Sequence, residues 1–384
     1  MIIKKTPEDF VVREVLQAPP RTQEGPFRLF LLEKRGWNTR DAMKALADRT
    51  KVPLREIRAA GQKDKNARTA QHLSVPARFD LTCSGDGFSV SFAGYGDAPL
   101  GHPSLRGNRF DVVLRNMGKR EAASAERRLL ETADRGFINY FGDQRFGAVG
   151  QGGEFLAEML VKRLYGPALR KYLSACHPEA PVAVKRRKSL VAERWGRWDE
   201  VASLCDEPHL KKMAEILRAK GAAGFRACLA LIPADEMGMH FSAYSSFLWN
   251  ETLSRFLADQ KGALFPVRLR TGEVLQFRSL DETLALRLRT EPLATVAPDM
   301  PALPEDMGEV FLRLLAERGV RLSKFRLKEI PQAYFASFPR ACLVVPEDLS
   351  VAREEDALYQ GRFALRAGFF LPRGSYGTVL LGVL

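Results

Sequence analysis

The feature that most constrains this chain of 384 residues is its division into strand-like ends and a helix-like middle. Near the N-terminus, apolar residues alternate or cluster over residues 9–16, 27–33, 88–93 and 110–115, and such runs return after Pro339. In the middle, they recur at helical spacing among many charges. Since a period of two is typical of strands and 3.6 of helices, we predict an α+β protein whose sheet domain is interrupted by a second domain.

This pattern predicts that residues 1–150 and 339–384 form the sheet domain and that residues 151–338 form the inserted one. Thr39 is the expected N-cap of an early helix. Residues 119–134 predict an amphipathic helix closed by Gly136, and apolar residues over 241–256 predict a core helix. The last residues, Tyr376–Leu384, are apolar and predict a final strand.

The chain is basic, with 59 Lys and Arg against 46 Asp and Glu, a net charge of +13. This balance favours an anionic partner, with nucleic acid first and a membrane surface second. Five scattered cysteines without a C-x-x-C pair support neither a disulfide framework nor a zinc site. No signal peptide and no apolar run of spanning length is visible, so we expect a cytoplasmic protein without a membrane partner.

The segment Ala60–Gln71 gathers lysines, an arginine, an aspartate and amides around Gly61. Asp64 is its only acid, and Lys63 and Lys65 flank it. Adjacent positive charge keeps a carboxylate ionised and available as a nucleophile or base. Gly61 would allow a sharp turn or a close approach to a ligand. A lysine-rich surface turn is the alternative interpretation.

This segment resembles the signature G-x-K-D-x-x-A-x-T-x-Q of the TruD family of tRNA pseudouridine synthases, and every fixed position matches. Three further segments match in the family's order: Pro7–Val12, Asn139–Gly147 and Leu371–Thr378. A weaker fifth segment, Phe241–Asn250, is similar to the family's S-x-x-x-S-x-x-x-N helix. One departure is Gly377, where the family commonly has alanine.

The resemblance implies a pseudouridine-synthase catalytic domain with a mixed, mostly antiparallel sheet, an inserted α/β TRUD domain, and a cleft between them. It implies an isomerase, an intramolecular transferase, that converts uridine-13 of tRNA to pseudouridine without a cofactor or metal. We expect tRNA as the partner and a monomer.

Carried over by position, Asp64 is the catalytic aspartate, and its attack on C6, its attack on C1′ and elimination to a glycal all stay open. Phe10 and Tyr376 match aromatic substrate contacts, with core packing as the alternative. Asn139 suits a uracil edge or is a turn residue. Lys63 meets a phosphate or pairs with Asp64. The remaining expected RNA contacts are Phe141 and Arg145.

Two other classes of function compete. A non-catalytic RNA-binding or RNA-folding protein would share the charge and the basic run Lys185–Lys188 near Trp195 and Trp198, which could equally be a solvated turn beside a local core. A nuclease or methyltransferase would need clustered carboxylates, a histidine pair or a glycine-rich cofactor loop, and none is visible in the sequence.

Overall fold

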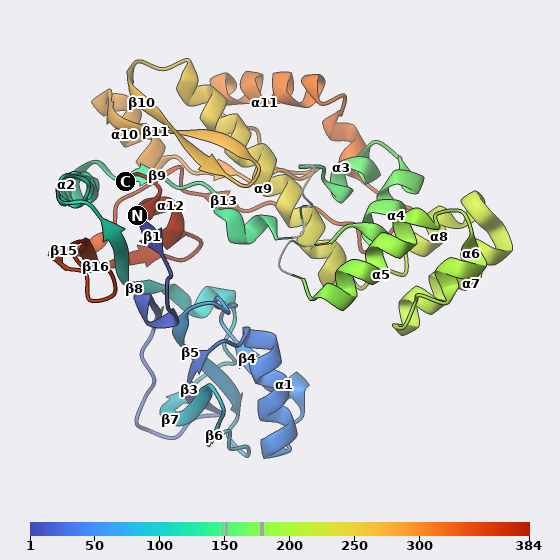
Figure 1. Ribbon diagram of the computed structural model, residues 1–384, viewed down its shortest axis with the longest axis horizontal. Helices are drawn as coiled ribbons and strands as arrows, with labels where there is room; N and C mark the ends of the chain where they lie inside the picture. The colour runs from blue at the N-terminus through green and yellow to red at the C-terminus, as the bar shows by residue number, and fades with distance from the viewer. Residues whose placement is uncertain (148, 150–152, 177–179) are drawn as a thin grey trace. The chain divides into compact units, whose positions relative to one another are not determined.

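The computed structural model describes residues 1–147, 149, 153–176 and 180–384. These residues form two compact units (Figure 1), of which unit 1 comprises Met1–Phe137 and Val344–Leu384 and unit 2 comprises Ile138–Leu343. The expected domain change between residues 150 and 151 lies outside the described residues. No described helix has the length and apolar character that crossing a membrane requires.

Unit 1 is built on one sheet with the strand order β15-β16-β8-β2-β5-β3-β7-β6, while β1 pairs with β8 and β4 with β5. Its strands are β1 (Ile2–Ile3), β2 (Phe10–Leu16), β3 (Phe27–Arg35), β4 (Arg58–Ala59), β5 (Arg68–Pro76), β6 (Cys83–Gly85), β7 (Phe88–Gly96), β8 (Leu105–Met117), β15 (Glu347–Glu355) and β16 (Phe363–Pro372). Among these pairs, β2 and β5 run parallel and the others antiparallel. The predicted α+β class with a mostly antiparallel sheet is therefore confirmed.

Three α-helices belong to unit 1: α1 (Thr39–Thr50), α2 (Lys119–Arg135) and α12 (Gly377–Leu381). Helix α1 buries Ala42 and Leu46 in a core with Phe30 and Leu32 of β3 and Leu73 of β5. This core forms because β3 and α1 each turn one apolar face toward the other, as periods of two and 3.6 allow. Helix α2 lies beside β15 and β16, and it ends at Gly136, whose φ of +74° favours glycine.

Two expectations for unit 1 are wrong. The N-cap of α1 is Asn38, whose side-chain oxygen accepts from Asp41 N at 2.8 Å, because the Thr39 hydroxyl is engaged elsewhere. The last residues form the short helix α12 and not a strand, with Tyr376 O accepting from Val379 N at 3.0 Å. Both edges of β16 already carry partners, β15 and β8, so a following strand could not pair beside it.

Unit 2 is mainly helical, with one hairpin of β10 (Gly262–Leu269) and β11 (Gly272–Leu280). Its helices are α3 (Leu156–Val161), α4 (Tyr165–Ser174), α5 (Val182–Glu193), α6 (Trp198–Ala202), α7 (Pro208–Lys220), α8 (Phe225–Leu229), α9 (Ala234–Ala258), α10 (Glu282–Thr290) and α11 (Glu305–Glu317). Its other strands are β12 (Leu293–Ala294) and β13 (Pro339–Arg340), and β9 (Phe137–Ile138) and β14 (Leu343–Val344) lie where the chain passes between the units.

Helix α9 is the predicted core helix and buries residues on every side, including Tyr244, Leu248 and Trp249. The apolar run that follows Pro339 does not form one continuous strand, since only the two-residue strands β13 and β14 form there. Trp195 and Trp198 pack edge-to-face with ring centroids 5.1 Å apart, and both contact Phe225. This arrangement matches the local-core interpretation of the two tryptophans.

Candidate active site

Asp64 lies in the loop that joins β4 to β5, and its side chain is 22% exposed. One carboxylate oxygen, Oδ2, forms an ion pair and hydrogen bond with Lys4 Nζ, whose side chain is 19% exposed. The pair is therefore mostly withdrawn from water and yet reachable from it. Partial burial strengthens the attraction between the two charges and holds the carboxylate in one orientation.

Lys4 also links Asp64 to an aromatic ring, because its Nζ lies 4.2 Å from the ring centroid of Phe10. Its backbone has a φ of +59°, a conformation that residues other than glycine rarely adopt and that clusters at functional sites. Sequence reasoning missed Lys4. The available signal was its place a few residues before the matched segment Pro7–Val12, but residue type alone does not separate it from Lys5.

Lys34, on β3, is buried to 2% exposure beneath the Asp64 loop. Its Nζ donates to three main-chain carbonyls: Trp37 O at 2.7 Å, Asp64 O at 3.0 Å and Lys63 O at 3.2 Å. Burial lowers the pKa of Lys34 to about 8, with Lys63 acting in the same direction and Asp64 opposing it. A buried cation therefore fixes the backbone on which the Asp64 side chain stands.

Lys63 and the adjacent Asp64 have different ion-pair partners. Lys63 Nζ forms a salt bridge with Glu14 Oε2 at 2.8 Å, with side chains exposed to 6% and 0%. Burial alone would raise the pKa of Glu14, but interactions with His72 and Lys63 bring it below the usual value. Lys63 is therefore paired with Glu14 on β2 and not with Asp64. Its ammonium is also not exposed for contact with a phosphate.

Thr39 and Gln71 complete the support of the loop. The Thr39 hydroxyl donates to Gln71 Oε1 at 2.8 Å and accepts from Lys63 N at 2.8 Å, while Gln71 Nε2 donates to Gly61 O at 3.1 Å. Gly61 itself does not have a positive φ, and a Cβ there would meet only ordinary contacts at 3.9 Å and beyond. The sharp turn expected at Gly61 is therefore not what requires glycine there.

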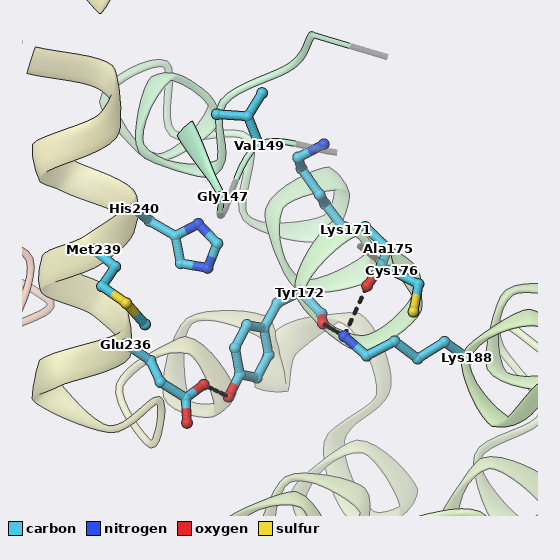
Figure 2. Close-up of a pocket in the computed structure, with 10 residues that line it drawn as sticks. All are labelled: Gly147, Val149, Lys171, Tyr172, Ala175, Cys176, Lys188, Glu236, Met239 and His240. Atoms are coloured by element: carbon cyan, nitrogen blue, oxygen red, sulfur yellow. Dashed lines mark hydrogen bonds between the residues drawn. The ribbon is translucent and has the colours of Figure 1, made fainter. Parts of the chain in front are cut away.

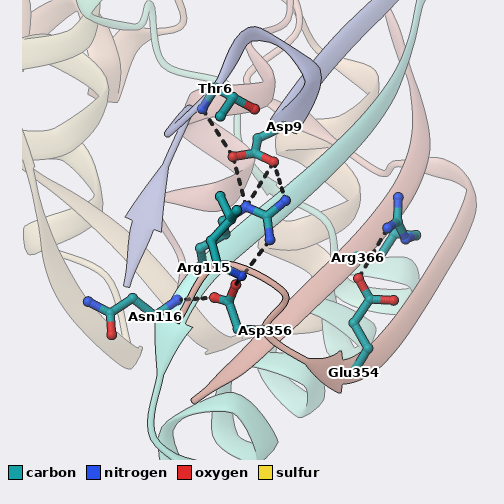
Figure 3. Close-up of polar contacts among 8 residues, drawn as sticks. Thr6, Asp9, Arg115, Asn116, Glu354, Asp356 and Arg366 are labelled. Carbon is teal, nitrogen blue, oxygen red and sulfur yellow. Dashed lines mark hydrogen bonds and ion pairs between the residues drawn. The ribbon is translucent and has the colours of Figure 1, made fainter. Parts of the chain in front are cut away.

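The start of β2 is anchored by a buried charge network (Figure 3). Arg115 of β8 donates from Nη2 to Asp9 Oδ1 at 2.7 Å and from Nη1 to Asp356 Oδ1 at 3.0 Å. Asp9 also accepts from Thr6 N at 3.1 Å, and Asp356 accepts from Asn116 N at 2.7 Å. Because the bidentate arginine fork is rigid, this network positions the short segment between Lys4 and Phe10.

The two aromatic residues expected to contact substrate differ in exposure. Phe10 is only 3% exposed and packs edge-to-face on Phe110 with ring centroids 6.0 Å apart, whereas Tyr376 is partly buried at the N-cap of α12. The following residue, Gly377, approaches Phe110 so closely that a Cβ would lie 2.9 Å from its Cε1. The Phe110 ring therefore leaves no room for a side chain at position 377.

In unit 2, Asn139 is 3% exposed and its amide is already bonded. Its Nδ2 donates to Ala341 O at 3.1 Å and its Oδ1 accepts from Arg340 Nη2 at 3.1 Å. Arg340, itself buried, also donates to Asn139 O at 2.6 Å and Tyr140 O at 3.1 Å. Sequence reasoning missed Arg340, which is 201 residues away from Asn139 along the chain.

Phe141 and Arg145 continue this segment. Phe141 is 1% exposed, and Asn250 of α9 clamps its backbone, accepting from N at 2.9 Å and donating to O at 3.0 Å. The guanidinium of Arg340 lies 3.9 Å from the Phe141 ring centroid. Arg145, in a 3-10 turn, donates from Nη1 to Ser242 Oγ at 3.1 Å.

The residues expected at the site thus belong to two groups. Asp64, Lys63, Phe10 and Tyr376 lie in unit 1, whereas Asn139, Phe141 and Arg145 lie in unit 2. Among the residues that the structure describes, no group of three or more His, Cys, Asp or Glu side chains could hold a metal ion.

Comparison with known proteins relates these features to one family. The family model for tRNA pseudouridine synthase D (TruD) matches residues 1–382. A probable tRNA pseudouridine synthase D 1 from Methanococcus maripaludis is 26% identical, covering 99% of this chain and 98% of that relative. The tRNA pseudouridine synthase D of Aquifex aeolicus is 27% identical, covering 99% of this chain and 96% of its own length.

A solved structure shares the fold. The putative tRNA pseudouridine synthase D (TruD) from Methanosarcina mazei matches with a TM-score of 0.71 at 22% identity, covering 99% of this chain and 92% of that one. The family match spans nearly the whole chain and includes the segments around Phe10, Asp64, Asn139 and Tyr376. The chain therefore belongs to the TruD family of tRNA pseudouridine synthases, which are isomerases.

Proposed function

We propose that this protein converts uridine-13 of tRNA to pseudouridine and that Asp64 is the catalytic nucleophile. The observation that carries the proposal is the support of this one carboxylate. Lys4 pairs with the Asp64 side chain, and Lys34 holds the carbonyls of Lys63 and Asp64. Precise support of a reacting group on a rigid scaffold is what positioning catalysis requires.

The chemistry needs no oxidant or reductant, because substrate and product are isomers. The N1–C1′ bond of uridine breaks and a C5–C1′ bond forms, while C5 loses its proton and N1 gains one. A positioned carboxylate can act as the nucleophile that separates these steps. Lys4, beside both Asp64 and Phe10, would orient the carboxylate next to the aromatic ring.

The substrate contacts belong to the same proposal. Tyr376 is partly exposed and suited to stack on an unstacked base. Arg145 and Phe141, which lie in the segment that begins at Asn139, would also contact the RNA. Because the amide of Asn139 and the ammonium of Lys63 are engaged inside the protein, RNA would have to replace those partners to reach either group.

The test compares wild type with Asp64→Asn on unmodified tRNA, with pseudouridine mapped by carbodiimide modification and reverse-transcription stops. We expect a new stop at position 13 with wild type and a rate at least about 1,000-fold lower with Asp64→Asn, at unchanged tRNA affinity. The matched control is Asp48→Asn, an exposed aspartate on α1, which should behave as wild type.

Full activity of Asp64→Asn would remove Asp64 from the mechanism. Tight tRNA binding by wild type without any pseudouridine would instead favour a non-catalytic RNA-binding protein. A stop at another position would keep the reaction and replace the target nucleotide.

A further inference from the structure

Unit 2 carries two basic runs, and they differ in how far the protein itself engages their charges. In the first run, Lys185–Lys188, Lys188 Nζ donates to Ala175 O at 2.7 Å and so caps a carbonyl at the C-terminal end of α4 (Figure 2). Arg187 forms an ion pair with Asp206 at 3.3 Å. The charge of this run is therefore partly used within unit 2.

The second run lies in residues 321–328, shortly after α11, and we call these residues the basic segment. It contains four cations and no acid. All four side chains are exposed, namely Arg321, Lys324, Arg326 and Lys328. None of the four forms a hydrogen bond or ion pair with a side chain or backbone group that the structure describes. By contrast, the exposed Arg313 of the same unit pairs with Asp259 at 3.8 Å.

The basic segment presents its cations because its apolar residues are anchored in the core. Phe325 is 1% exposed, and its ring centroid lies 4.7 Å from that of Phe335. Leu327 is also buried. Buried and exposed residues alternate from Phe325 to Lys328, as they do in an extended chain with one buried face. Anchoring of the two apolar side chains therefore leaves Arg326 and Lys328 in solvent.

Another basic residue, Arg163, fixes the backbone of the basic segment from outside it. Its Nη1 donates to Lys324 O at 3.1 Å and its Nη2 donates to Arg326 O at 3.0 Å. Its Nε forms an ion pair with Glu329 Oε1 at 2.9 Å, and the Tyr165 hydroxyl donates to the same oxygen at 2.8 Å. The acid that follows the segment is thus already paired, and the rigid guanidinium holds the segment in one shape.

We propose that the basic segment binds the phosphate backbone of the tRNA substrate, a contact that rests on the proposed function. Clustered cations without counter-charges repel one another, and bound phosphates would remove that repulsion. Lysine and arginine side chains on a fixed backbone suit the closely spaced charges of a nucleic acid. Because contacts to phosphates carry no base information, the segment would hold and orient tRNA without reading its sequence.

An anionic membrane surface is the other class of partner that such charges could serve. A segment that lies in a membrane interface needs exposed apolar side chains beside its cations. Phe325 and Leu327 are instead buried in unit 2. The arrangement of the basic segment therefore favours RNA.

The test measures the Kd of the whole protein for unmodified tRNA by fluorescence anisotropy, over a salt series from about 50 to about 300 mM. In the segment variant, Lys324→Met is combined with Lys328→Met. We expect its Kd to be about 10-fold higher than that of wild type at the lowest salt. The slope of log Kd against log salt should fall by roughly 1.5, because each lost phosphate contact removes about 0.7 to 0.9.

The matched control combines Lys211→Met with Lys212→Met, which removes the same charge from exposed positions on α7 of the same unit. Its Kd should stay within about 2-fold of the wild-type value, since distant exposed charges are screened by salt. Equal losses of affinity in the two variants would overturn the proposal, because net charge alone would then decide binding.

Three further outcomes would also overturn the proposal. The first is a segment variant with the Kd and slope of wild type. The second is a loss of affinity without a change in slope, because loss of phosphate contacts changes counterion release. The third is a wild type that does not bind tRNA at the lowest salt.

Cosedimentation with vesicles of phosphatidylserine and phosphatidylcholine tests the membrane alternative. We expect wild type and the segment variant to sediment equally. Loss of vesicle binding in the segment variant, with unchanged affinity for tRNA, would replace RNA by a membrane as the partner. A wild type that binds tRNA but forms no pseudouridine would contradict the proposed function, whereas the salt series would still decide the contact of the basic segment.

Discussion

The two units each hold a matched motif segment with a buried cation, but they use different cations. In unit 1, Lys34 donates to the carbonyls of Trp37, Lys63 and Asp64. In unit 2, Arg340 donates to the carbonyls of Asn139 and Tyr140 and stacks on aromatic rings. Both cations are almost fully buried, with exposures of 2% for Lys34 and 5% for Arg340.

The difference lies in how each cation keeps its charge. An ammonium is a compact, strongly hydrated charge that loses its proton readily when buried, whereas a guanidinium stays charged and binds through a planar fork. The Asp64 loop therefore depends on a proton that burial makes easier to lose. The Asn139 segment depends on shape and stacking. This contrast gives three ways to test the two supports.

The largest effect is expected from Lys34→Met. The three carbonyls lose their common donor, and the loop should shift enough to lower the rate of pseudouridine formation about 100-fold. The free energy of unfolding should change by less than about 2 kcal/mol, because removing a buried charge offsets the lost hydrogen bonds. Turnover assays and chemical denaturation measure both quantities.

Lys44→Met, an exposed lysine on α1, is the matched control and should change neither quantity. Wild-type turnover in Lys34→Met would show that the loop does not need this ammonium. Lys34 would then have no supporting role comparable to that of Arg340.

A smaller effect is expected from Arg340→Lys. The variant keeps the charge but loses the fork to Asn139 and the stacking on Phe141, so unfolding should cost about 2 kcal/mol less. Activity should fall about 10-fold, since the Asn139 segment stays attached through Asn250 and Cys342. Arg313→Lys, which changes an exposed arginine paired with Asp259, is the control. Equal stability of Arg340→Lys and Arg313→Lys would mean that charge alone at position 340 holds the Asn139 segment.

The smallest local effect is a pH dependence of amide protection in the Asp64 loop of unit 1. Above pH 8 the neutral Lys34 amine has two hydrogens for three carbonyls, so amide protection in residues 61–66 should fall about 10-fold by pH 9.5 relative to residues 139–141. Hydrogen exchange corrected for intrinsic rates measures this ratio. A parallel change in both segments would remove Lys34 as its cause.

The same titration has the opposite sign for global stability. Burial places the pKa of Lys34 near 8, below the usual 10.5, so between these values the unfolded chain binds more protons. Its contribution to the free energy of unfolding is therefore constant below pH 8 and rises by up to about 3 kcal/mol toward pH 10.5. The free energy of unfolding of wild type should therefore increase relative to that of Lys34→Met over this window. A constant difference would contradict the assignment.

Much of the fold follows from local pattern. The alternation of β2, β3 and β8, the helix α2 with its terminal Gly136, and the core helix α9 were all predicted from periodicity and end signals. The end of the chain was not, because Val379–Val383 is apolar enough for either a strand or a helix. Pairing decided between them, since β16 already has two neighbours.

At the site, the sequence by itself determined which short segments we propose to carry chemistry, because Asp64 and its neighbours are contiguous and local spacing identifies them. Only the tertiary structure decided which groups support them. Lys4 reaches Asp64 across 60 residues, Glu14 reaches Lys63 across 49, and Arg340 reaches Asn139 across 201. Such partners are set by strand register and burial. A lysine or arginine looks the same in the sequence whether its side chain lies in solvent or is buried beneath a loop.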